Sequence, residues 1–233
     1  MKWLSDPTRR FIERPHFLES EIQQRLDSAL TRCFSGAPSF PLTDNELDLL
    51  VDSVTEHYDP MADLHSHLGI DVEGVTVFRP GHRPRVKISS HLLVDNLRRR
   101  RRMTIAHEVG HVLLHCDLYQ EDRTLDLFSD TNARGRIFCK TSTMLPGADW
   151  MEWQASFTAG CLLMPSAAMR QVMLTLRGDA LQQPLYLDDS FTIDVITDVA
   201  RAFDVSEDAA KVRLIQTGFV EPHRAIQRLP LWE

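Results

Sequence analysis

The segment His107–His111, which reads HEVGH, constrains this chain more than any other part of its sequence. It lies in a stretch from about 95 to 115 whose apolar residues recur at helical spacing, which predicts a long helix. Four residues turn a helix by about 400°, so the two histidines differ in direction by only ~40° and lie ~6 Å apart along the axis. Both imidazoles can therefore reach a single ion.

Glu108 lies between the two histidines and is offset by ~100° from His107 on the predicted helix. This offset directs its carboxylate beside the ion, where it would act as a general base on a water that the ion activates. Zinc suits imidazole ligands and lowers the pKa of such a water to about 7. The motif thus predicts one Zn²⁺ per chain, with His107 and His111 as ligands and Glu108 as the catalytic residue.

Gly110 is the costly residue of this motif, because glycine inside a helix costs ~1 kcal/mol relative to alanine. A helix that accepts this penalty usually needs another part of the chain to approach its backbone closely. We expect a strand or a second helix to pack against Gly110, over the metal site.

Glu152 is the best candidate for a third metal ligand. A catalytic zinc takes three protein ligands and keeps a further position open. Glu152 lies at the start of a second predicted long helix, which begins near Ala148 and ends before Pro165. A carboxylate near a helix N-terminus is also favoured by the helix dipole. From the pattern alone, a ligand role and a purely structural role are equally well supported.

The rest of the sequence predicts helices around these two segments and one small sheet. Val72–Val77 and Val86–Ile88 flank the turn residues Pro80–Pro84, which is typical of a β-hairpin. Weaker strand signals lie near 125–128 and 136–139. The combination indicates an α+β fold that is mainly helical, with a small antiparallel sheet next to the active-site helix. Apolar spacing and capping residues predict further helices over 17–34, 43–54, 166–176 and, as two short helices, 191–219.

The composition limits the classes of partner. There are 26 basic and 33 acidic residues, for a net charge of -7, which makes nucleic acid an unlikely partner because affinity for phosphates comes largely from Lys and Arg. No stretch approaches the ~18 consecutive apolar residues of a membrane span, and the N-terminus lacks the apolar run of a signal peptide. We therefore expect a cytoplasmic protein, in which the four cysteines are free thiols.

Two segments resemble the signatures of the ImmA/IrrE family of metallo-endopeptidases. Met103–His115 (MTIAHEVGHVLLH) is similar to the family's active-site helix, and Glu152–Pro165 (EWQASFTAGCLLMP) is similar to the segment that follows it. The resemblance extends to the hairpin over 71–88 and to the helical tail over 205–219. Ser156 is a departure, since the family often has Asn there, but its hydroxyl can still hold a ligand by a hydrogen bond.

The resemblance implies a role for each matching residue. His107 and His111 match the zinc-binding histidines, Glu108 matches the catalytic glutamate, and Glu152 matches the third ligand. It further implies a zinc endopeptidase of the gluzincin type that cleaves a specific intracellular protein, often a helix-turn-helix transcriptional repressor. The corresponding division of the chain is an N-terminal helical extension over 1–40, a zinc metallopeptidase domain over 41–185 and a C-terminal helical tail over 186–233.

Two other functions compete with this interpretation. The protein could keep the zinc site but be catalytically silent, acting as a regulatory module that binds protein or DNA. It could also be a zinc hydrolase such as a deformylase, but those enzymes take a cysteine ligand from an upstream strand, and 72–88 contains no cysteine. The tail resembles a helix-turn-helix, yet residues 188–218 hold seven acids and three bases, which disfavours DNA binding.

Several further residues have two interpretations. His115 could contact substrate, but we favour a partly buried histidine at the end of the helix. The five arginines of 98–102 could form a basic patch, but we favour a solvated helix face with one or two arginines paired to acids. The segment 116–149 could be a lid, a substrate-binding loop or surface padding. Four residues could stabilise an oxyanion, although the sequence does not choose among them: His65, His67, Tyr119 and His223.

Overall fold

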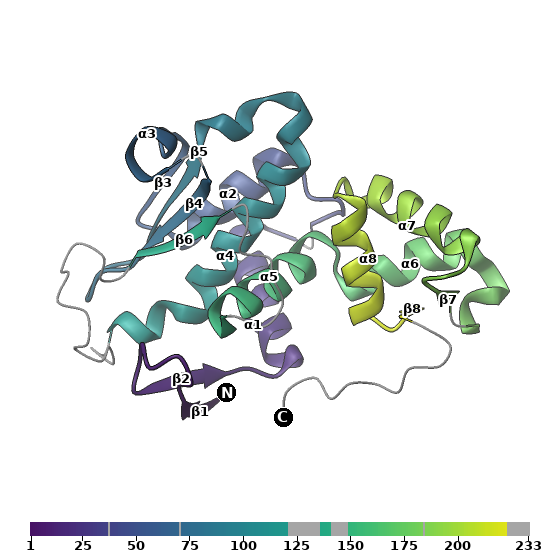
Figure 1. Cartoon of the computed structure of the whole chain (residues 1–233), viewed down its shortest axis with the longest axis horizontal. Helices are drawn as coiled ribbons and strands as arrows, with labels where there is room; N and C mark the ends of the chain where they lie inside the picture. Colours follow the sequence, from purple (N-terminus) through teal and green to yellow (C-terminus); the bar gives the residue numbers. More distant parts are fainter. Residues whose placement is uncertain (37, 70, 121–135, 141–148, 184, 223–233) are drawn as a thin grey trace. The chain divides into compact units, whose positions relative to one another are not determined.

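The computed structural model describes residues 1–36, 38–69, 71–120, 136–140, 149–183 and 185–222 (Figure 1). The chain divides into two compact units, Met1–Leu163 and Met164–Glu233. The fold is α+β, as the sequence predicts. No described helix combines the length and the apolar character that a membrane span requires.

The first unit contains a four-stranded sheet with the strand order β3–β5–β4–β6. Strands β4 (Val72–Val77) and β5 (Arg85–Ser89) form the antiparallel hairpin that the sequence predicts. Strand β6 (Arg136–Lys140) pairs antiparallel with the other edge of β4. Strand β3 (His57–Ala62) runs parallel to β5 and was not predicted. The hairpin is therefore the inner pair of a larger, mixed sheet.

Four long helices belong to the same unit as this sheet. They are α1 (Glu19–Cys33), α2 (Asp44–Val54), α4 (Arg98–Gln120) and α5 (Trp150–Leu163). Helix α4 contacts the sheet on one side and α5 on the other, and α2 packs along it (Figure 1). Shorter elements complete the unit: β1 (Lys2–Ser5), β2 (Glu13–His16), α3 (His65–Leu68) and the 3-10 helices η1 (Ser90–Leu93) and η2 (Asp95–Leu97).

Local sequence signals explain where these helices begin. Thr43 caps α2: its hydroxyl accepts a hydrogen bond from the Glu46 amide at 3.2 Å, and Glu46 accepts one from the Thr43 amide at 2.7 Å. Helix α5 begins at Trp150, and Pro165 follows its last turn, as predicted. Helix α4 continues beyond His115, where the sequence pattern predicted its end, and Leu118 in the added turn is buried.

The arginine run at the start of α4 is paired with acids. Arg102 has a side chain only 1% exposed, contacts Asp44 at 2.6 Å and donates to the Leu42 carbonyl at 2.8 Å. Arg101 contacts Asp48 at 3.0 Å. These contacts confirm the expected pairing, but the expected solvated face is wrong for Arg102, which is buried and anchors α2 to α4.

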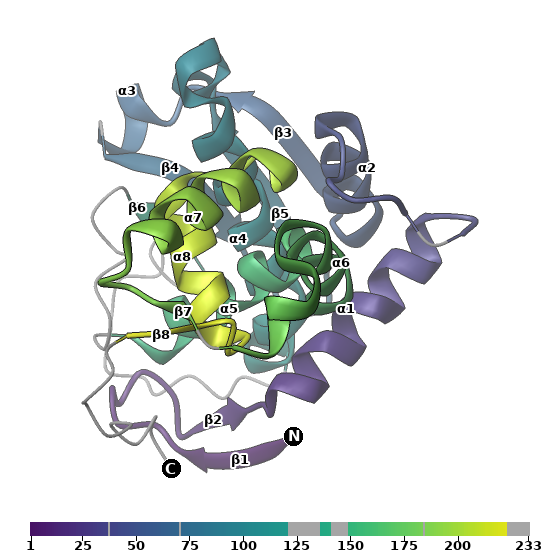
Figure 2. The ribbon, with the colours of Figure 1, turned by 90° about the vertical axis from the view of Figure 1, so that its right-hand side faces the viewer.

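The second unit is built from α6 (Ser166–Arg177), α7 (Ser190–Phe203) and α8 (Glu207–Gln216) (Figure 2). The 3-10 helix η3 (Gly178–Gln182) follows α6, and the short strands β7 (Leu185–Tyr186) and β8 (Val220–Glu221) pair in parallel. The two short helices predicted for the tail are therefore confirmed.

Arg213 on α8 is buried, although it counts among the few basic residues of the tail. It donates to the Met164 carbonyl at 3.0 Å and to the Ser166 hydroxyl at 3.1 Å. Its guanidinium thus holds α8 to the start of α6 inside the second unit. One of the three bases in residues 188–218 is consequently turned away from solvent.

Candidate metal centre and active site

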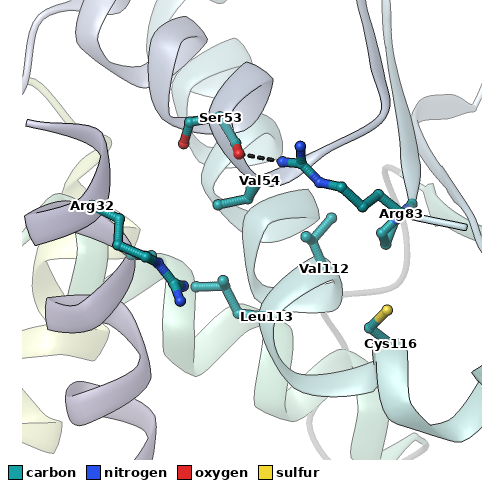
Figure 3. A pocket seen from close by; sticks show the side chains of 9 residues that line it. Arg32, Ser53, Val54, Arg83, Val112, Leu113 and Cys116 are labelled. Carbon is teal, nitrogen blue, oxygen red and sulfur yellow. Dashed lines mark hydrogen bonds between the residues drawn. The ribbon is translucent and has the colours of Figure 1, made fainter.

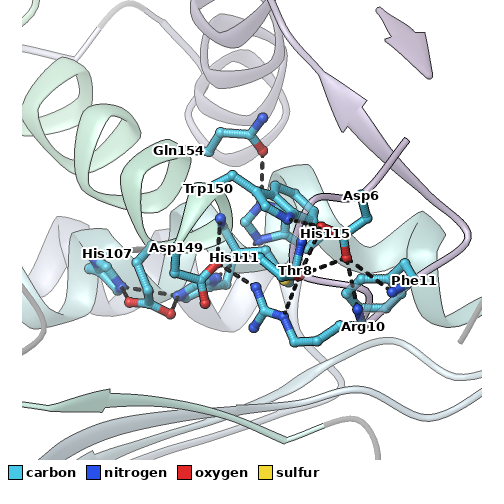
Figure 4. A network of polar contacts seen from close by, with 12 residues as sticks. Asp6, Thr8, Arg10, Phe11, His107, His111, His115, Asp149, Trp150 and Gln154 are labelled. Carbon is cyan, nitrogen blue, oxygen red and sulfur yellow. Dashed lines mark hydrogen bonds and ion pairs between the residues drawn. The ribbon is translucent and has the colours of Figure 1, made fainter. Parts of the chain in front are cut away.

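His107, His111 and Glu152 converge at the contact between α4 and α5 (Figure 4). The Nε2 atom of His107 lies 3.0 Å from Nε2 of His111 and 3.0 Å from Oε2 of Glu152. The Nε2 atom of His111 lies 3.4 Å from Oε1 of Glu152. The structure therefore brings together the three residues that the sequence predicted as metal ligands.

This group has the chemistry and spacing that a zinc ion requires. Two imidazole nitrogens and one carboxylate oxygen form a typical donor set of catalytic zinc. Tetrahedral coordination at about 2.0–2.1 Å would separate the ligand atoms by roughly 3.3 Å. The observed separations of 3.0, 3.0 and 3.4 Å are close to that value, so the residues fit a metal ion with little rearrangement.

The charges of Glu152 and His111 are also those that a metal requires. Burial alone would raise the pKa of Glu152, but hydrogen bonds with His107 and His111 outweigh it and hold the pKa well below its usual value. Burial lowers the pKa of His111, which favours the neutral imidazole. An ionised carboxylate and neutral imidazoles are the forms that bind a metal.

Glu108 is fully buried on the side of α4 that faces strand β4. The hydroxyl of Thr76 donates a hydrogen bond to its Oε2. Its Oε1 is buried and has no hydrogen-bond partner within the described ranges. Burial raises the pKa of Glu108 to about 7, against the opposing effects of His107 and Thr76. A group that titrates near neutral pH is suited to both accept and return a proton.

Gly74 on β4 creates the space for this carboxylate. A Cβ atom at Gly74 would lie 2.4 Å from Oε1 of Glu108 and 3.0 Å from its Cδ. Residues two apart on a strand face the same side, so Gly74 and Thr76 contact Glu108 together. The motif did not reveal either residue, although a glycine inside a strand can indicate a close approach.

Gly110 has the close neighbour that its position in the helix predicted. Ala155 of α5 approaches it, and a Cβ at Gly110 would lie 2.8 Å from both the Cα and the carbonyl oxygen of Ala155. The neighbour is thus the second helix, which also carries Glu152. The glycine lets α4 and α5 approach closely enough for the three ligand atoms to meet.

Polar contacts at the Nδ1 atoms hold the rings of His107 and His111. The hydroxyl of Ser156 lies 3.3 Å from Nδ1 of His107, so Ser156 makes the kind of contact expected from the sequence. The Nδ1 atom of His111 lies 3.0 Å from Nδ1 of His115. His115 is fully buried within α4, so its interpretation as a partly buried residue at the helix end is wrong.

The N-terminal segment is joined to the start of α5 (Figure 4). Asp6 accepts a hydrogen bond from the indole of Trp150 at 2.9 Å, and Arg10 pairs with Asp149. The amide of Phe11 donates to Asp6, and its ring lies in a buried cluster with Phe78, Leu118 and Met151. The turn that presents Glu152 is therefore braced by residues far away in the sequence.

The other candidate residues take different places. His65 packs its ring against His91, with centroids 4.7 Å apart. Tyr119 stacks on Phe78, and burial raises the pKa of its hydroxyl. His223 lies outside the described residues, as do the strand predicted near 125–128 and most of the segment 116–149. A role in stabilising the oxyanion stays a prediction for each of these candidates.

A cavity of about 440 Å³ lies between α1, α2 and α4 (Figure 3). Val112, Leu113 and Cys116 contribute from α4, and Arg32 lines it from α1. Arg83 also lines it and donates to the Ser53 carbonyl in the last turn of α2. None of the three convergent ligand residues, nor Glu108, lines this cavity, so it is separate from the candidate active site.

A comparison with known families agrees with this geometry. The family model Peptidase_M78, described as the IrrE N-terminal-like domain, matches residues 78–215, which is more than half of the chain. The match includes Glu108 and the three residues of the candidate metal centre. A search of curated proteins found no match. The chain therefore belongs to the ImmA/IrrE family of metallopeptidases.

Proposed function

We propose that this protein is a zinc-dependent endopeptidase that hydrolyses a peptide bond in a specific intracellular protein. One observation carries the proposal: ligand atoms of His107, His111 and Glu152 lie within 4.8 Å of one another. They do so beside Glu108, a buried carboxylate with a pKa raised to about 7. A metal donor set and a general base in one place are the parts that metal-assisted hydrolysis needs.

Each residue has a distinct role in this proposal. His107, His111 and Glu152 would hold the ion. When bound, zinc supplies Lewis acidity, which polarises the scissile carbonyl and acidifies water. Glu108 accepts the proton of the attacking water at Oε1 and returns it to the leaving amine. Thr76 occupies Oε2 through its hydrogen bond, which leaves Oε1 as the oxygen that exchanges the proton.

The substrate that we propose is a helix-turn-helix transcriptional repressor. This part of the proposal rests on the family resemblance. Nucleic acid is a poor alternative partner for the tail, because residues 188–218 carry seven acids and three bases and one of the bases, Arg213, is buried.

A repressor encoded beside this protein would be the first substrate to test. We expect the purified, zinc-loaded protein to cut it at one site, detected by mass spectrometry of the fragments. Glu108→Gln should keep its zinc by elemental analysis and lose at least about 100-fold in cleavage rate. Glu152→Ala should lose both zinc and cleavage.

These variants also separate the competing functions. A Glu108→Gln protein that keeps zinc and retains full biological activity would identify a catalytically silent regulatory module instead of a peptidase. Unchanged zinc content in Glu152→Ala would remove Glu152 from the ligand set and with it the gluzincin-like assignment.

A further inference from the structure

His111 begins a chain of hydrogen bonds that runs from α4 through α5 to strand β2. Its Nδ1 atom lies 3.0 Å from Nδ1 of His115. The Nε2 atom of His115 lies 3.0 Å from Oε1 of Gln154, and the Gln154 amide donates to the Pro15 carbonyl at 2.9 Å. All four residues are buried (Figure 4 shows the three side chains). Bulk water does not reach these groups, so each donor in this series of hydrogen bonds must face an acceptor within the protein.

The last acceptor fixes the direction of every bond in the chain. A proline carbonyl can only accept, so Gln154 must turn its NH₂ group to Pro15 and its Oε1 to His115. The Nε2 atom of His115 must then carry a proton and donate it to Gln154. A neutral imidazole with a proton on Nε2 has an acceptor at Nδ1.

The same logic sets the tautomer of His111. Because Nδ1 of His115 accepts, Nδ1 of His111 must carry the proton that it donates. The Nε2 atom of His111 is then left with a free lone pair. That atom is the one that points at His107 and Glu152, at 3.0 and 3.4 Å.

A second contact orients the middle of the chain. The ring of Trp150 packs edge-on against the ring of His115, with centroids 5.5 Å apart. The indole of Trp150 is in turn held by Asp6 at 2.9 Å. Both Asp6 and Pro15 precede residue 78, where the matched domain begins.

We propose that His115 and Gln154 are positioning residues that set the tautomer and ring orientation of His111 for the metal, with the Pro15 carbonyl fixing the direction of the chain. This inference rests on the proposed metal role of His111. It assigns to the N-terminal segment a part in the metal centre, although that segment contains no metal ligand in the proposal. Partners of this kind typically change metal affinity or activity by 10–100-fold when they are removed.

The tautomers can be measured without any substitution. In ¹⁵N-labelled wild-type protein, long-range ¹H–¹⁵N spectra distinguish Nδ1–H from Nε2–H histidines. We expect His111 to carry its proton on Nδ1 and His115 on Nε2, both before and after zinc is added. A proton on Nδ1 of His115, or a doubly protonated ring, would overturn the inference.

Zinc affinity tests the functional part of the inference. We expect Gln154→Leu and His115→Phe each to weaken zinc binding about 10–100-fold in competition with a chromophoric chelator. The double variant should lose little more than the weaker single variant, because both substitutions break one chain. Fully additive losses, or unchanged affinity in both folded variants, would contradict the proposal.

Thr55→Val is the matched control for the loss of a buried hydrogen bond. Thr55 is buried in the same unit and donates to the Val51 carbonyl at 2.9 Å, outside the chain to His111. The zinc affinity of Thr55→Val should equal that of the wild-type protein. Wild-type protein that binds no zinc would overturn the proposed function and this inference together. Wild-type protein that binds zinc no better than the variants would overturn the inference alone.

Discussion

The backbone of Ala155 occupies the space that a side chain at Gly110 would need. This contact joins the two helices that carry the metal centre, since Gly110 lies one residue before His111 and Ala155 lies three residues after Glu152. The separation of the helices at this point sets the distance between ligand atoms on α4 and on α5. The site should therefore be sensitive to even one added methyl group.

Gly110→Ala should weaken zinc binding and lower Tm. Alanine favours a helix by ~1 kcal/mol, but here its Cβ meets backbone atoms at 2.8 Å, which cannot rotate away. The two helices must separate, at a cost of about 1–3 kcal/mol for overpacking. Calorimetry and zinc titration measure both effects. Gly36→Ala is the control, because no atom lies within 4 Å of its added Cβ. Equal Tm values for the two variants would contradict the prediction.

Thr76→Val should shift the pH dependence of peptide cleavage. The Thr76 hydroxyl stabilises the charged form of Glu108 and lowers its pKa against the larger effect of burial. Valine has nearly the same shape but cannot donate, so the pKa of Glu108 should rise further. The acidic limb of the kcat/KM profile should move to higher pH. At neutral pH, kcat/KM should therefore fall about tenfold. An acidic limb at its wild-type position would show that Thr76 does not act on the base.

The contribution of Glu108 to the stability of the metal-free protein should fall as the pH rises from about 4.5 to about 7. Burial raises the pKa of Glu108 from 4.5 to about 7, so in this window the folded chain keeps a proton that the unfolded chain has lost. Glu108→Gln cannot ionise. The stability of Glu108→Gln relative to the wild type should therefore increase with pH. Above pH 7, the difference in their free energies of unfolding should have shifted in favour of the variant by up to about 3 kcal/mol from its value at pH 4.5. Urea unfolding in a chelator at pH 5 and pH 8 measures this, and a difference independent of pH would refute it.

Arg102→Met should be far more destabilising than Arg98→Ala, although both arginines contact Asp44. The side chain of Arg102 is 1% exposed and that of Arg98 is 51% exposed. Loss of the buried charge-assisted hydrogen bonds to Asp44 and Leu42 should cost about 2 kcal/mol. Loss of the exposed pair should cost less than about 1 kcal/mol. Chemical denaturation compares the two, and equal losses would contradict the assignment of Arg102 as an anchor.

The metal centre divides into parts that the sequence could and could not predict. The spacing of His107 and His111 defines their geometry, because a helix places residues four apart on one face. Glu152 is 45 residues beyond His107, and helix spacing says nothing about contacts between separate helices. Its placement needed the family resemblance. Gly74 and Thr76 were missed, because only the packing of β4 against α4 brings them to Glu108.

The missed parts of the fold have similar physical causes. Strand β3 (His57–Ala62) contains Pro60, which hides a strand pattern but is tolerated because β3 lies at an edge of the sheet. The hairpin of β1 and β2 has four residues in each strand, too few to show an alternation. His115 was misjudged because α4 continues beyond the point where its apolar pattern weakens.

The register of strand β4 decides which of its residues contact the carboxylate of Glu108. In the observed register Gly74 pairs with Ile88 and Thr76 pairs with Val86. A slip of β4 by one residue would turn Gly74 and Thr76 away and direct Val75 at Glu108. The carboxylate would then lose its space and its hydrogen-bond donor at once. Changes in the length of the turn between β4 and β5 are therefore compatible with catalysis only if they preserve the pairing of the two strands.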